Sequence, residues 1–390
     1  MNLELLRSAP SGTQFPEGTV LLHDWLTGFR GGEWILEAFC EMAPKAPLYT
    51  LLHVPGTTSK LIEGRKIHTS FLNELPGIGH HYRKFLPLFP RAAESLRVPP
   101  ETNLMVSSSH CVIKGVPKPS GAFHLSYIHS PMRYMYDQFD SYFGASSGAP
   151  LYQRLGARAL RGSLTRWDIN SNKNIDLLVA NSGFVRERIR RIYGRDSVVV
   201  HPFVEFEDFS GVAAAREAGD LPREDFYLMV TAFAPNKRVD LAIAAFNQMG
   251  KILKIVGSGQ DDVKLRAMAG PTIEFLGSVS RASVVSLMAQ ARAFIFPGVE
   301  DFGITPLESL ASGTPVIAFK SGGVLETLTE SDTVFFERAD VASLVQAVEI
   351  FETRSMRSDF AIDSSRLALF GRERFKSEIM SLLPGRLGSR

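Results

Sequence analysis

The sequence predicts an α/β protein with two doubly wound, Rossmann-like domains that face each other across a cleft. The first supporting observation is size: 390 residues, of which 45% are hydrophobic and 22% charged, exceed what one compact core accommodates. The second is pattern, because short apolar segments bounded by Gly, Pro or Asn alternate with segments of helical period. Such alternation is typical of a parallel sheet covered by helices on both faces.

The alternation is clearest in the second half of the chain. There we expect strands at 227–232, 252–257, 272–277, 291–298, 314–319 and 332–336. Helices are expected at 239–249, 261–269, 281–290, 305–312 and about 340–351. The first half shows the same theme less cleanly, with strands expected at 19–24, 48–53, 103–109, 123–130, 176–182 and 197–203.

These elements divide into an N-terminal domain at 1–204 and a C-terminal domain at 205–370. The segment at 203–225 is expected to join them, and a helix within 371–390 is expected to return to the first domain. Ligands of such sheets bind beyond the carboxyl ends of the strands. Candidate functional residues are therefore sought at those ends.

Bulk composition limits the classes of protein. The first residues lack the apolar core of a signal peptide, and no run of about 18 apolar residues could cross a bilayer, so a cytoplasmic protein is expected. Cys40 and Cys111 lie in apolar segments without metal-ligand spacing, which predicts reduced structural thiols and no metal site. The net charge is +2, but the first half of the chain is basic. This asymmetry fits attraction to an anionic acceptor or membrane face, and it fits an ordinary solvated surface equally well. No nucleic-acid partner is expected.

Two glutamates follow the strand expected at 291–298. Glu300 lies in the loop after it, and Glu308 lies eight positions later. Thr305 as N-cap, Pro306 in the first turn and Glu308 in a capping box would start a helix there. A loop with free amides that leads into a helix N-terminus suits a diphosphate or the oxygens of a sugar. A capping-box glutamate alone needs no ligand, but the pair together with its Gly-containing loop favours a binding site.

A cationic turn follows the strand expected at 227–232. Lys237 is a point charge that can neutralise a phosphate, and Arg238 either helps it or only pairs with Asp240. A Lys-Arg pair at a helix start is usually solvated. Its position at a strand end favours a phosphate site instead.

Two strand ends of the first domain also carry candidate residues. The strand at 19–24 leads to Gly31 and Gly32, just before a helix that is expected to begin near Glu33. These glycines either bring backbone amides close to a ligand or form a turn that needs positive φ. A later strand ends in His129, an imidazole that by itself would more often be a structural histidine.

Taken in chain order, six motifs resemble those of one family. They are Gly-Gly-Glu (31–33), His-Ser-Pro-Met-Arg-Tyr (129–134), Ala-Asn-Ser (180–182), Asn-Lys-Arg-Val-Asp (236–240), Val-Gly-Ser-Gly (256–259) and the glutamate pair at 300 and 308. The combination is similar to the retaining glycosyltransferases of family four, which have the GT-B architecture of two facing Rossmann-like domains. The resemblance extends from about His23 to Phe351 and is strongest to bacterial mannosyltransferase-like enzymes of surface polysaccharide biosynthesis.

The resemblance implies a role for each matching residue. Lys237 would bind the diphosphate of the donor, Glu300 the hydroxyls of the transferred sugar, and Glu308 the ribose. His129 would lie near the anomeric carbon. Further donor contacts are implied for Gly31 and Gly32 of the first domain, and for Gly257, Ser258, Gly259, Gly277, Val279, Phe302, Gly303 and Ile304 of the second.

The chain departs from the family pattern at one position. Five residues before the lysine many members carry an arginine that shares the diphosphate, whereas this chain has Ala232. Lys237 would then act alone or with Arg238, Arg133 or Arg30, and the sequence does not choose among them. No metal or other cofactor is implied.

The implied reaction moves a hexose to a polysaccharide or lipid-linked glycan acceptor, with GDP-mannose favoured as donor over UDP-sugars. The acceptor hydroxyl would attack on the face from which the diphosphate leaves, so no enzyme nucleophile is needed. The segment at 79–91 mixes basic and large apolar residues, which fits peripheral contact with the inner face of the cell membrane or packing between helices.

Two alternatives from other classes stay open. A non-catalytic sensor of nucleotide sugars could share the fold, although its glutamate pair would be expected to be broken. A nicotinamide-dependent oxidoreductase would need a G-x-G-x-x-G turn after a first strand, and neither half has one.

Overall fold

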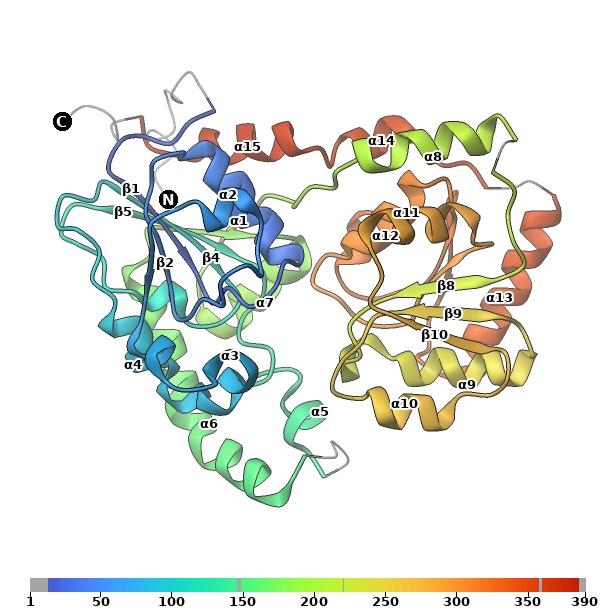
Figure 1. Ribbon diagram of the computed structural model, residues 1–390, viewed down its shortest axis with the longest axis horizontal. Coiled ribbons are helices and arrows are strands. Elements are labelled where there is room, and N and C mark those ends of the chain that lie inside the picture. The colour runs from blue at the N-terminus through green and yellow to red at the C-terminus, as the bar shows by residue number, and fades with distance from the viewer. Residues whose placement is uncertain (1–12, 146–148, 220, 358–359, 386–390) are drawn as a thin grey trace. The chain divides into compact units, whose positions relative to one another are not determined.

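The computed structural model describes residues 13–145, 149–219, 221–357 and 360–385. The chain divides into two compact units (Figure 1). One comprises the residues up to Pro202 together with the segment from Arg372, and the other comprises Phe203–Gly371. Among the described residues, no helix is both long enough and apolar enough to cross a bilayer.

The first unit is built on a seven-stranded parallel sheet in the order β3-β2-β1-β4-β5-β6-β7. Its strands are β1 (Thr19–His23), β2 (Leu48–Thr50), β3 (Ile67–Thr69), β4 (Leu104–Ser109), β5 (Phe123–Ile128), β6 (Leu177–Ala180) and β7 (Val198–Val199). Its helices are α1 (Gly31–Met42), α2 (Lys60–Glu63), α3 (Ile78–His81), α4 (Phe89–Ser95), α5 (Phe139–Phe143), α6 (Leu151–Ser171), α7 (Gly183–Tyr193) and α15 (Arg372–Ser381). Strand order reverses direction between β1 and β4, both of which are buried along their whole length.

The second unit is built on a six-stranded parallel sheet in the order β10-β9-β8-β11-β12-β13. Its strands are β8 (Tyr227–Val230), β9 (Leu253–Val256), β10 (Ile273–Gly277), β11 (Phe294–Phe296), β12 (Val316–Phe319) and β13 (Thr333–Phe336). Its helices are α8 (Glu207–Glu217), α9 (Val239–Met249), α10 (Asp262–Met268), α11 (Arg281–Gln290), α12 (Ile304–Ala311), α13 (Val341–Met356) and α14 (Ser364–Ala368). Here the order reverses between β8 and β11.

The two parallel sheets with helices packed on them confirm the expected fold class. Each sheet separates two apolar layers, and in the second unit these layers form two distinct hydrophobic clusters. The reversal of strand order in each sheet creates a crevice at the carboxyl ends of the two central strands, and this is where open α/β sheets bind ligands.

Several elements differ from expectation, and three of them matter most here. The segment at 203–225 is not an open connection, because it contains α8, whose Phe209 is fully buried in the core of the second unit. Strand β3 and the long helix α6 were not expected from the sequence. Helix α6 buries only Leu164 and Asp168 completely, and its core-facing apolar residues are few: Leu160, Leu164 and Trp167.

Candidate active site

The two candidate residues of opposite charge meet at the switch point of the second unit. The ends of β8 and β11 line a small hollow, together with Lys237 and Glu300. The ammonium group of Lys237 donates a hydrogen bond to Glu300 Oε1, and both side chains are about one-fifth exposed. The structure therefore brings together, within one unit, two residues that lie 63 positions apart in the sequence.

Close backbone packing holds the Lys237 turn in place. A side chain on Gly298, just after β11, would place its Cβ 2.4 Å from Asn236 O and 2.8 Å from Lys237 Cα. The amide of Val299 donates to Asn236 O at 3.2 Å. Only glycine lets the loop after β11 lie this close to the turn that carries Lys237.

Arg238 has a different environment from Lys237. Its backbone has φ of +52°, the only non-glycine positive φ among the described residues, and it caps α9. The guanidinium bonds Asp240, with Nε 3.1 Å from Oδ1. The structure thus shows the ion pair of Arg238 with Asp240, which was the simpler of the two interpretations of Arg238. The left-handed backbone conformation costs an arginine roughly 1 kcal/mol or more.

The helix after Glu300 begins earlier than predicted, and its capping box is wrong. Helix α12 starts at Ile304, with Gly303 at the N-cap in a left-handed conformation (φ +94°) and without a side-chain cap. Thr305 and Pro306 therefore lie inside the first turn. A glycine can bend the chain into the helix two residues sooner than a threonine cap would. Phe302 is buried beside this turn, and the first amides of α12 have no partner within the helix.

Glu308 is paired with a residue that the sequence did not single out. Arg281, at the start of α11, donates from Nη1 to Glu308 Oε1 at 2.6 Å and also bonds Asp208 of α8 at 3.1 Å. Burial raises the pKa of Glu308, and the charge of Arg281 offsets only part of this effect. The role predicted for Glu308 was a capping box or a ribose contact, and the first of these is excluded because α12 is capped at Gly303 and not at Thr305.

Two of the predicted glycines are required by contact with the chain after β8. A Cβ on Gly257, whose φ is +133°, would lie 1.8 Å from Thr231 O, and one on Gly259 would lie 2.5 Å from Phe233 O. Gly259 also forms an isolated parallel bridge with Phe233. Ser258, Gly277 and Val279 lie at the ends of the neighbouring strands β9 and β10. The predicted base-contacting residues thus share one sheet edge with the Lys237 turn.

In the first unit, polar side chains gather at the ends of β1, β4 and β5. His23 and Ser108 are register partners on β1 and β4, and His129 follows β5. Ser108 Oγ lies 3.1 Å from His23 Nδ1 and 2.7 Å from His129 Nε2. The Ala-Asn-Ser motif supports this cluster, because Asn181 Nδ2 donates to His129 O at 3.0 Å.

The glycine pair does not form a positive-φ turn. Gly31 and Gly32 are the first residues of α1, and neither is among the glycines with positive φ. A Cβ on Gly32 would lie 3.6 Å from His23 Cε1 and 3.8 Å from His129 Nε2. The interpretation of the glycine pair as a positive-φ turn was therefore wrong. The first turn of α1 instead lies against the imidazoles of His23 and His129.

Asp24, next to His23, organises the loop after β4. Its carboxylate accepts four backbone N–H bonds of 2.7–2.9 Å from residues 110–113. Burial alone would raise the pKa of Asp24, but His110, these amides and His23 together lower it. A carboxylate with four such donors has no lone pair left for a substrate, so Asp24 is structural.

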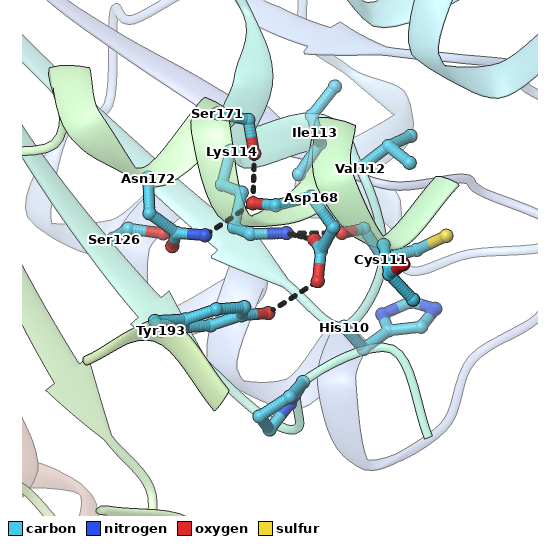
Figure 2. Close-up of polar contacts among 12 residues, drawn as sticks. His110, Cys111, Val112, Ile113, Lys114, Ser126, Asp168, Ser171, Asn172 and Tyr193 are labelled. Atoms are coloured by element: carbon cyan, nitrogen blue, oxygen red, sulfur yellow. Dashed lines mark hydrogen bonds and ion pairs between the residues drawn. The ribbon is translucent and has the colours of Figure 1, made fainter. Parts of the chain in front are cut away.

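A buried ion pair anchors the same loop from its other side (Figure 2). The ammonium group of Lys114 donates to Asp168 Oδ1 of α6 and, at 2.7 Å, to Cys111 O. Asp168 Oδ2 also accepts the hydroxyls of Tyr136 at 2.8 Å and Tyr193 at 3.0 Å. Because Lys114 is 2% and Asp168 0% exposed, this network fixes the loop that carries His110.

Sequence reasoning missed Arg281, Asp24, Lys114 and Asp168. For Asp24 a signal existed, since an acidic residue directly after a buried apolar strand is rarely exposed to solvent in a switch-point crevice. The partners of the other three are distant in sequence and follow no local pattern. Within the described ranges, no group of three or more His, Cys, Asp or Glu side chains is arranged to hold a metal ion.

Comparison with known proteins gives three kinds of match. Residues 213–364 match the family model described as glycosyl transferases group 1. The chain is 27% identical over 221 residues to a GDP-mannose-dependent alpha-(1-6)-phosphatidylinositol dimannoside mannosyltransferase of Mycobacterium tuberculosis, covering 54% of this chain and 58% of the relative. It is 27% identical over 206 residues to the human alpha-1,3/1,6-mannosyltransferase ALG2, covering 45% of this chain and 50% of the relative. The chain thus spans about half the length of the curated relatives it matches.

Solved structures resemble nearly the whole chain. WaaG, a glycosyltransferase involved in lipopolysaccharide biosynthesis, matches with a TM-score of 0.66 at 14% identity over 94% of this chain and all of that one. The sucrose-phosphate synthase of Thermosynechococcus elongatus matches with a TM-score of 0.69 at 16% identity, over 93% of this chain and 98% of the synthase. The fold therefore belongs to the GT-B class.

The sequence match with the family model covers most of the second unit. The second unit, which carries Lys237, Glu300 and Glu308, is a glycosyltransferase group 1 domain. This confirms the resemblance that the six motifs indicated.

Proposed function

We propose that this protein is a retaining glycosyltransferase that moves a hexose, with mannose favoured, from a nucleoside diphosphate sugar to a glycan or lipid-linked glycan. The observation that supports this best is the Lys237–Glu300 pair at the β8–β11 switch point of a glycosyltransferase group 1 domain. The names of the curated relatives, which include GDP-mannose-dependent mannosyltransferases, support mannose and GDP-mannose as the first choices.

The pair has the chemistry that a sugar donor needs. Without a donor, Lys237 and Glu300 neutralise each other. A bound donor would separate them: a diphosphate oxygen replaces Glu300 as partner of the ammonium group, and sugar hydroxyls donate to the released carboxylate. Lys237 would then stabilise the charge that develops on the departing diphosphate.

The surrounding elements suit the rest of the donor. The free amides at the start of α12 can bind anionic oxygens. Glu308, held by Arg281, would accept the two hydroxyls of the ribose. The base would pack at the edge formed by Gly257–Gly259 and by Gly277 and Val279.

The first unit would contribute the N-terminus of α1 and His129. The amides of Gly31 and Gly32 belong to the first turn of a 12-residue helix, whose positive end favours an anionic group. In this scheme the acceptor hydroxyl attacks on the face that the diphosphate leaves, a phosphate oxygen takes the proton, and the chain supplies orientation and charge. No resident cofactor takes part in the scheme.

Donor binding and turnover test the proposal together. A thermal-shift series with GDP-mannose, UDP-glucose, GDP and UDP should show the largest rise in Tm with GDP-mannose, because a ligand that binds only the folded chain stabilises it. With donor and a mannose-containing acceptor, free GDP should accumulate and the α-anomer should be retained. Donor binding without release of GDP would instead favour a nucleotide-sugar sensor, and inversion at the anomeric carbon would contradict the mechanism.

We also propose that the protein contacts the inner face of the cell membrane. The surface that supports this proposal is helix α6 and not the segment at 79–91. In the segment at 79–91, Tyr82 and Phe89 are buried in the core of the first unit, and Phe85, Leu86 and Leu88 pack against it. The basic residues Arg83, Lys84 and Arg91 are exposed. The apolar side chains of this segment thus pack in the core, which supports the alternative interpretation, packing between helices.

Helix α6 offers a better interfacial surface. Leu151, Tyr152 and Leu155 in its first turns are 65%, 72% and 56% exposed, and Arg158 and Arg166 are exposed on the same side. Figure 1 shows α6 as the long green helix that runs away from the sheet of its unit. The single acidic residue of the helix, Asp168, is buried, so the exposed side is apolar and positive, as contact with anionic lipid requires.

Vesicle binding tests this surface. The pair Leu151→Ser and Leu155→Ser should reduce sedimentation with vesicles that contain phosphatidylglycerol by about fivefold or more. The matched control is the pair Val263→Ser and Met356→Ser, since both residues are 84% exposed in the second unit. Equal binding by the α6 variant and the wild-type chain would remove the membrane-contact hypothesis.

A further inference from the structure

Arg281 bonds two carboxylates that belong to two different helices of the second unit. Its Nη1 donates to Glu308 Oε1 of α12 at 2.6 Å, and its Nε donates to Asp208 Oδ2 of α8 at 3.1 Å. Its Cζ lies 4.9 Å from the centre of the Phe209 ring, which is fully buried. These three contacts fix the plane and the direction of the guanidinium group.

The position of Arg281 in its own helix is not one that the helix favours. Arg281 is the first residue of α11, which is capped by Ser280 and has no acidic residue in its first turn. The amino end of a helix carries partial positive charge, so a cation is disfavoured there. The carboxylates of Asp208 and Glu308 offset this repulsion. The local structure of α11 therefore does not explain why an arginine lies at this point, and its contacts with the other two helices do.

Arg281 makes the two oxygens of the Glu308 carboxylate different from each other. Oε1 accepts the hydrogen bond from Arg281, whereas no residue that the structure describes donates to Oε2. The side chain of Glu308 is 9% exposed, and the exposed part includes Oε2. The carboxylate thus offers one acceptor, in one direction, to a ligand.

Arg281 also supports the charge of Glu308. Burial raises the pKa of Glu308, and the nearby carboxylate of Asp208 raises it further. Arg281 opposes both effects through its charge and its hydrogen bond, and no other charged group acts on this carboxylate among the described residues. Without Arg281 the ionised form would lose this support, and an uncharged acid accepts hydrogen bonds more weakly.

The ligand group that meets Oε2 follows from charge and position. An ionised carboxylate only accepts hydrogen bonds and repels a diphosphate, so its ligand must carry hydroxyl or amine hydrogens. Glu308 lies four residues after Ile304, the first residue of α12, which is about 6 Å along the helix axis. In the proposed function the diphosphate binds at the start of α12. The hydroxyls nearest to that diphosphate on the nucleoside side are those of the ribose, one ester bond away.

We propose that Arg281 is a positioning residue for nucleotide recognition: it holds Glu308 so that Oε2 accepts a ribose hydroxyl, and the site thereby selects ribonucleoside over deoxyribonucleoside diphosphates. This inference rests on the proposed function, because it takes the diphosphate to bind at the β8–β11 switch point. All the groups involved lie in the second unit. Arg281 itself does not contact the ribose in this arrangement, and its effect passes through Glu308.

Helix α10 supplies a matched control for Arg281. Arg266 donates from Nε to Asp262 Oδ2 at 2.8 Å, and its Cζ lies 4.7 Å from the centre of the Phe275 ring. Both arginines therefore combine an ion pair with an aromatic contact. Arg266→Met removes contacts of the same kinds without touching Glu308.

Calorimetry on the full chain tests the inference. GDP and UDP are titrated first, and whichever binds more tightly is compared with its 2′-deoxy and 3′-deoxy forms. The wild type should bind the ribonucleotide at least about tenfold more tightly than one of the deoxy forms, the size expected for loss of a hydrogen bond to a charged acceptor. At neutral pH, Arg281→Met and Glu308→Gln should each bring this ratio to within about twofold of one, whereas Arg266→Met should keep it. In the Glu308→Gln background, Arg281→Met should change the ratio no further, because both act through one contact.

A pH series separates positioning from a merely structural role. The wild-type preference for the ribonucleotide should fall as the pH drops through the pKa of Glu308, because protonation removes the ionised acceptor. In Arg281→Lys, where one ammonium group replaces the fork that reaches two carboxylates, this fall should occur at a higher pH. A loss of stability alone would weaken the binding of ribo and deoxy forms equally and would not move the midpoint.

Failure of the inference and failure of the proposed function give different results. An Arg281→Met chain that keeps the wild-type ratio would overturn the inference alone, as would an unshifted midpoint in Arg281→Lys. Ratios as expected without any transfer of sugar would leave the inference standing and refute the catalytic part of the proposed function. If neither GDP nor UDP binds, both fail. If Arg281→Met does not fold, the midpoint in Arg281→Lys decides.

Discussion

Replacing Lys114 by methionine tests whether the buried network in Figure 2 holds the first unit together. Methionine fills nearly the same volume but leaves Asp168 with a full negative charge at 0% exposure. The hydroxyls of Tyr136 and Tyr193 remain as donors to Asp168. Breaking a buried ion pair in this way typically costs about 3–5 kcal/mol. At a urea slope of about 2 kcal/mol per molar, the unfolding midpoint of this unit should fall by about 1.5–2.5 M.

The chain has a built-in probe for this measurement. All three tryptophans, Trp25, Trp34 and Trp167, lie in the first unit, so tryptophan fluorescence reports the unfolding of that unit alone. Circular dichroism follows both units. The expected result is an early fluorescence transition with an unchanged second transition by circular dichroism.

The double variant with Asp168→Asn is the control for the charge itself. Asparagine keeps an oxygen for the tyrosine hydroxyls and removes the unpaired charge, so the double variant should be more stable than Lys114→Met alone. A midpoint shift below about 0.5 M for Lys114→Met would refute the reasoning, because it would mean that the carboxylate is well solvated without its partner.

Three further predictions concern the site and its pH dependence. Lys237→Met and Glu300→Gln should each lower kcat by about 10²–10³-fold with the Tm nearly unchanged, and turnover within fivefold of wild type in both would contradict their roles. Gly298→Ala should weaken GDP binding at least about tenfold by calorimetry, because its Cβ would displace the backbone of the Lys237 turn; unchanged affinity would show that this turn does not bind the diphosphate. Burial lowers the pKa of His124 to about 3, so the unfolded chain binds this proton more tightly and stability should fall as the pH drops below about 6.5; His124→Gln should flatten that slope in pH-dependent urea titrations, and an equally steep slope would count against it.

The ion pair of Glu308 and Arg281 links helix α12 to helix α11. Because burial already raises the pKa of Glu308, its ionised form depends on the guanidinium beside it. For Glu308 the sequence suggested a helix cap or a ribose contact, and it did not indicate Arg281 as a partner. The ribose contact that we propose for Glu308 would therefore depend on a partner from a different helix, α11, and through Asp208 on α8.

The local sequence pattern was sufficient to predict most of the second unit. Strands β8 to β13 lie within the apolar runs that the sequence marks, and α9 and α11 begin and end at the residues expected from their period. The reason is that a strand buried on both faces needs a continuous apolar run, and an amphipathic helix needs a repeat of 3.6. The position of Lys237 and Glu300 at strand ends followed in the same way, since parallel strands all direct their carboxyl ends to one edge.

Tertiary structure decided the features that depend on distant partners. Helix α12 starts at Ile304 because Gly303 can adopt φ of +94° against Val324, and no residue beside Thr305 reveals this. Helix α6 is held by the buried pair of Asp168 and Lys114, a contact between residues 54 positions apart, together with Leu160, Leu164 and Trp167. The sequence by itself thus determined the strands of the second unit, several of its helices and which charges reach the sheet edge. Which charge pairs with which was decided only by packing, because Coulomb and hydrogen-bond partners are selected by distance in space and not by spacing along the chain.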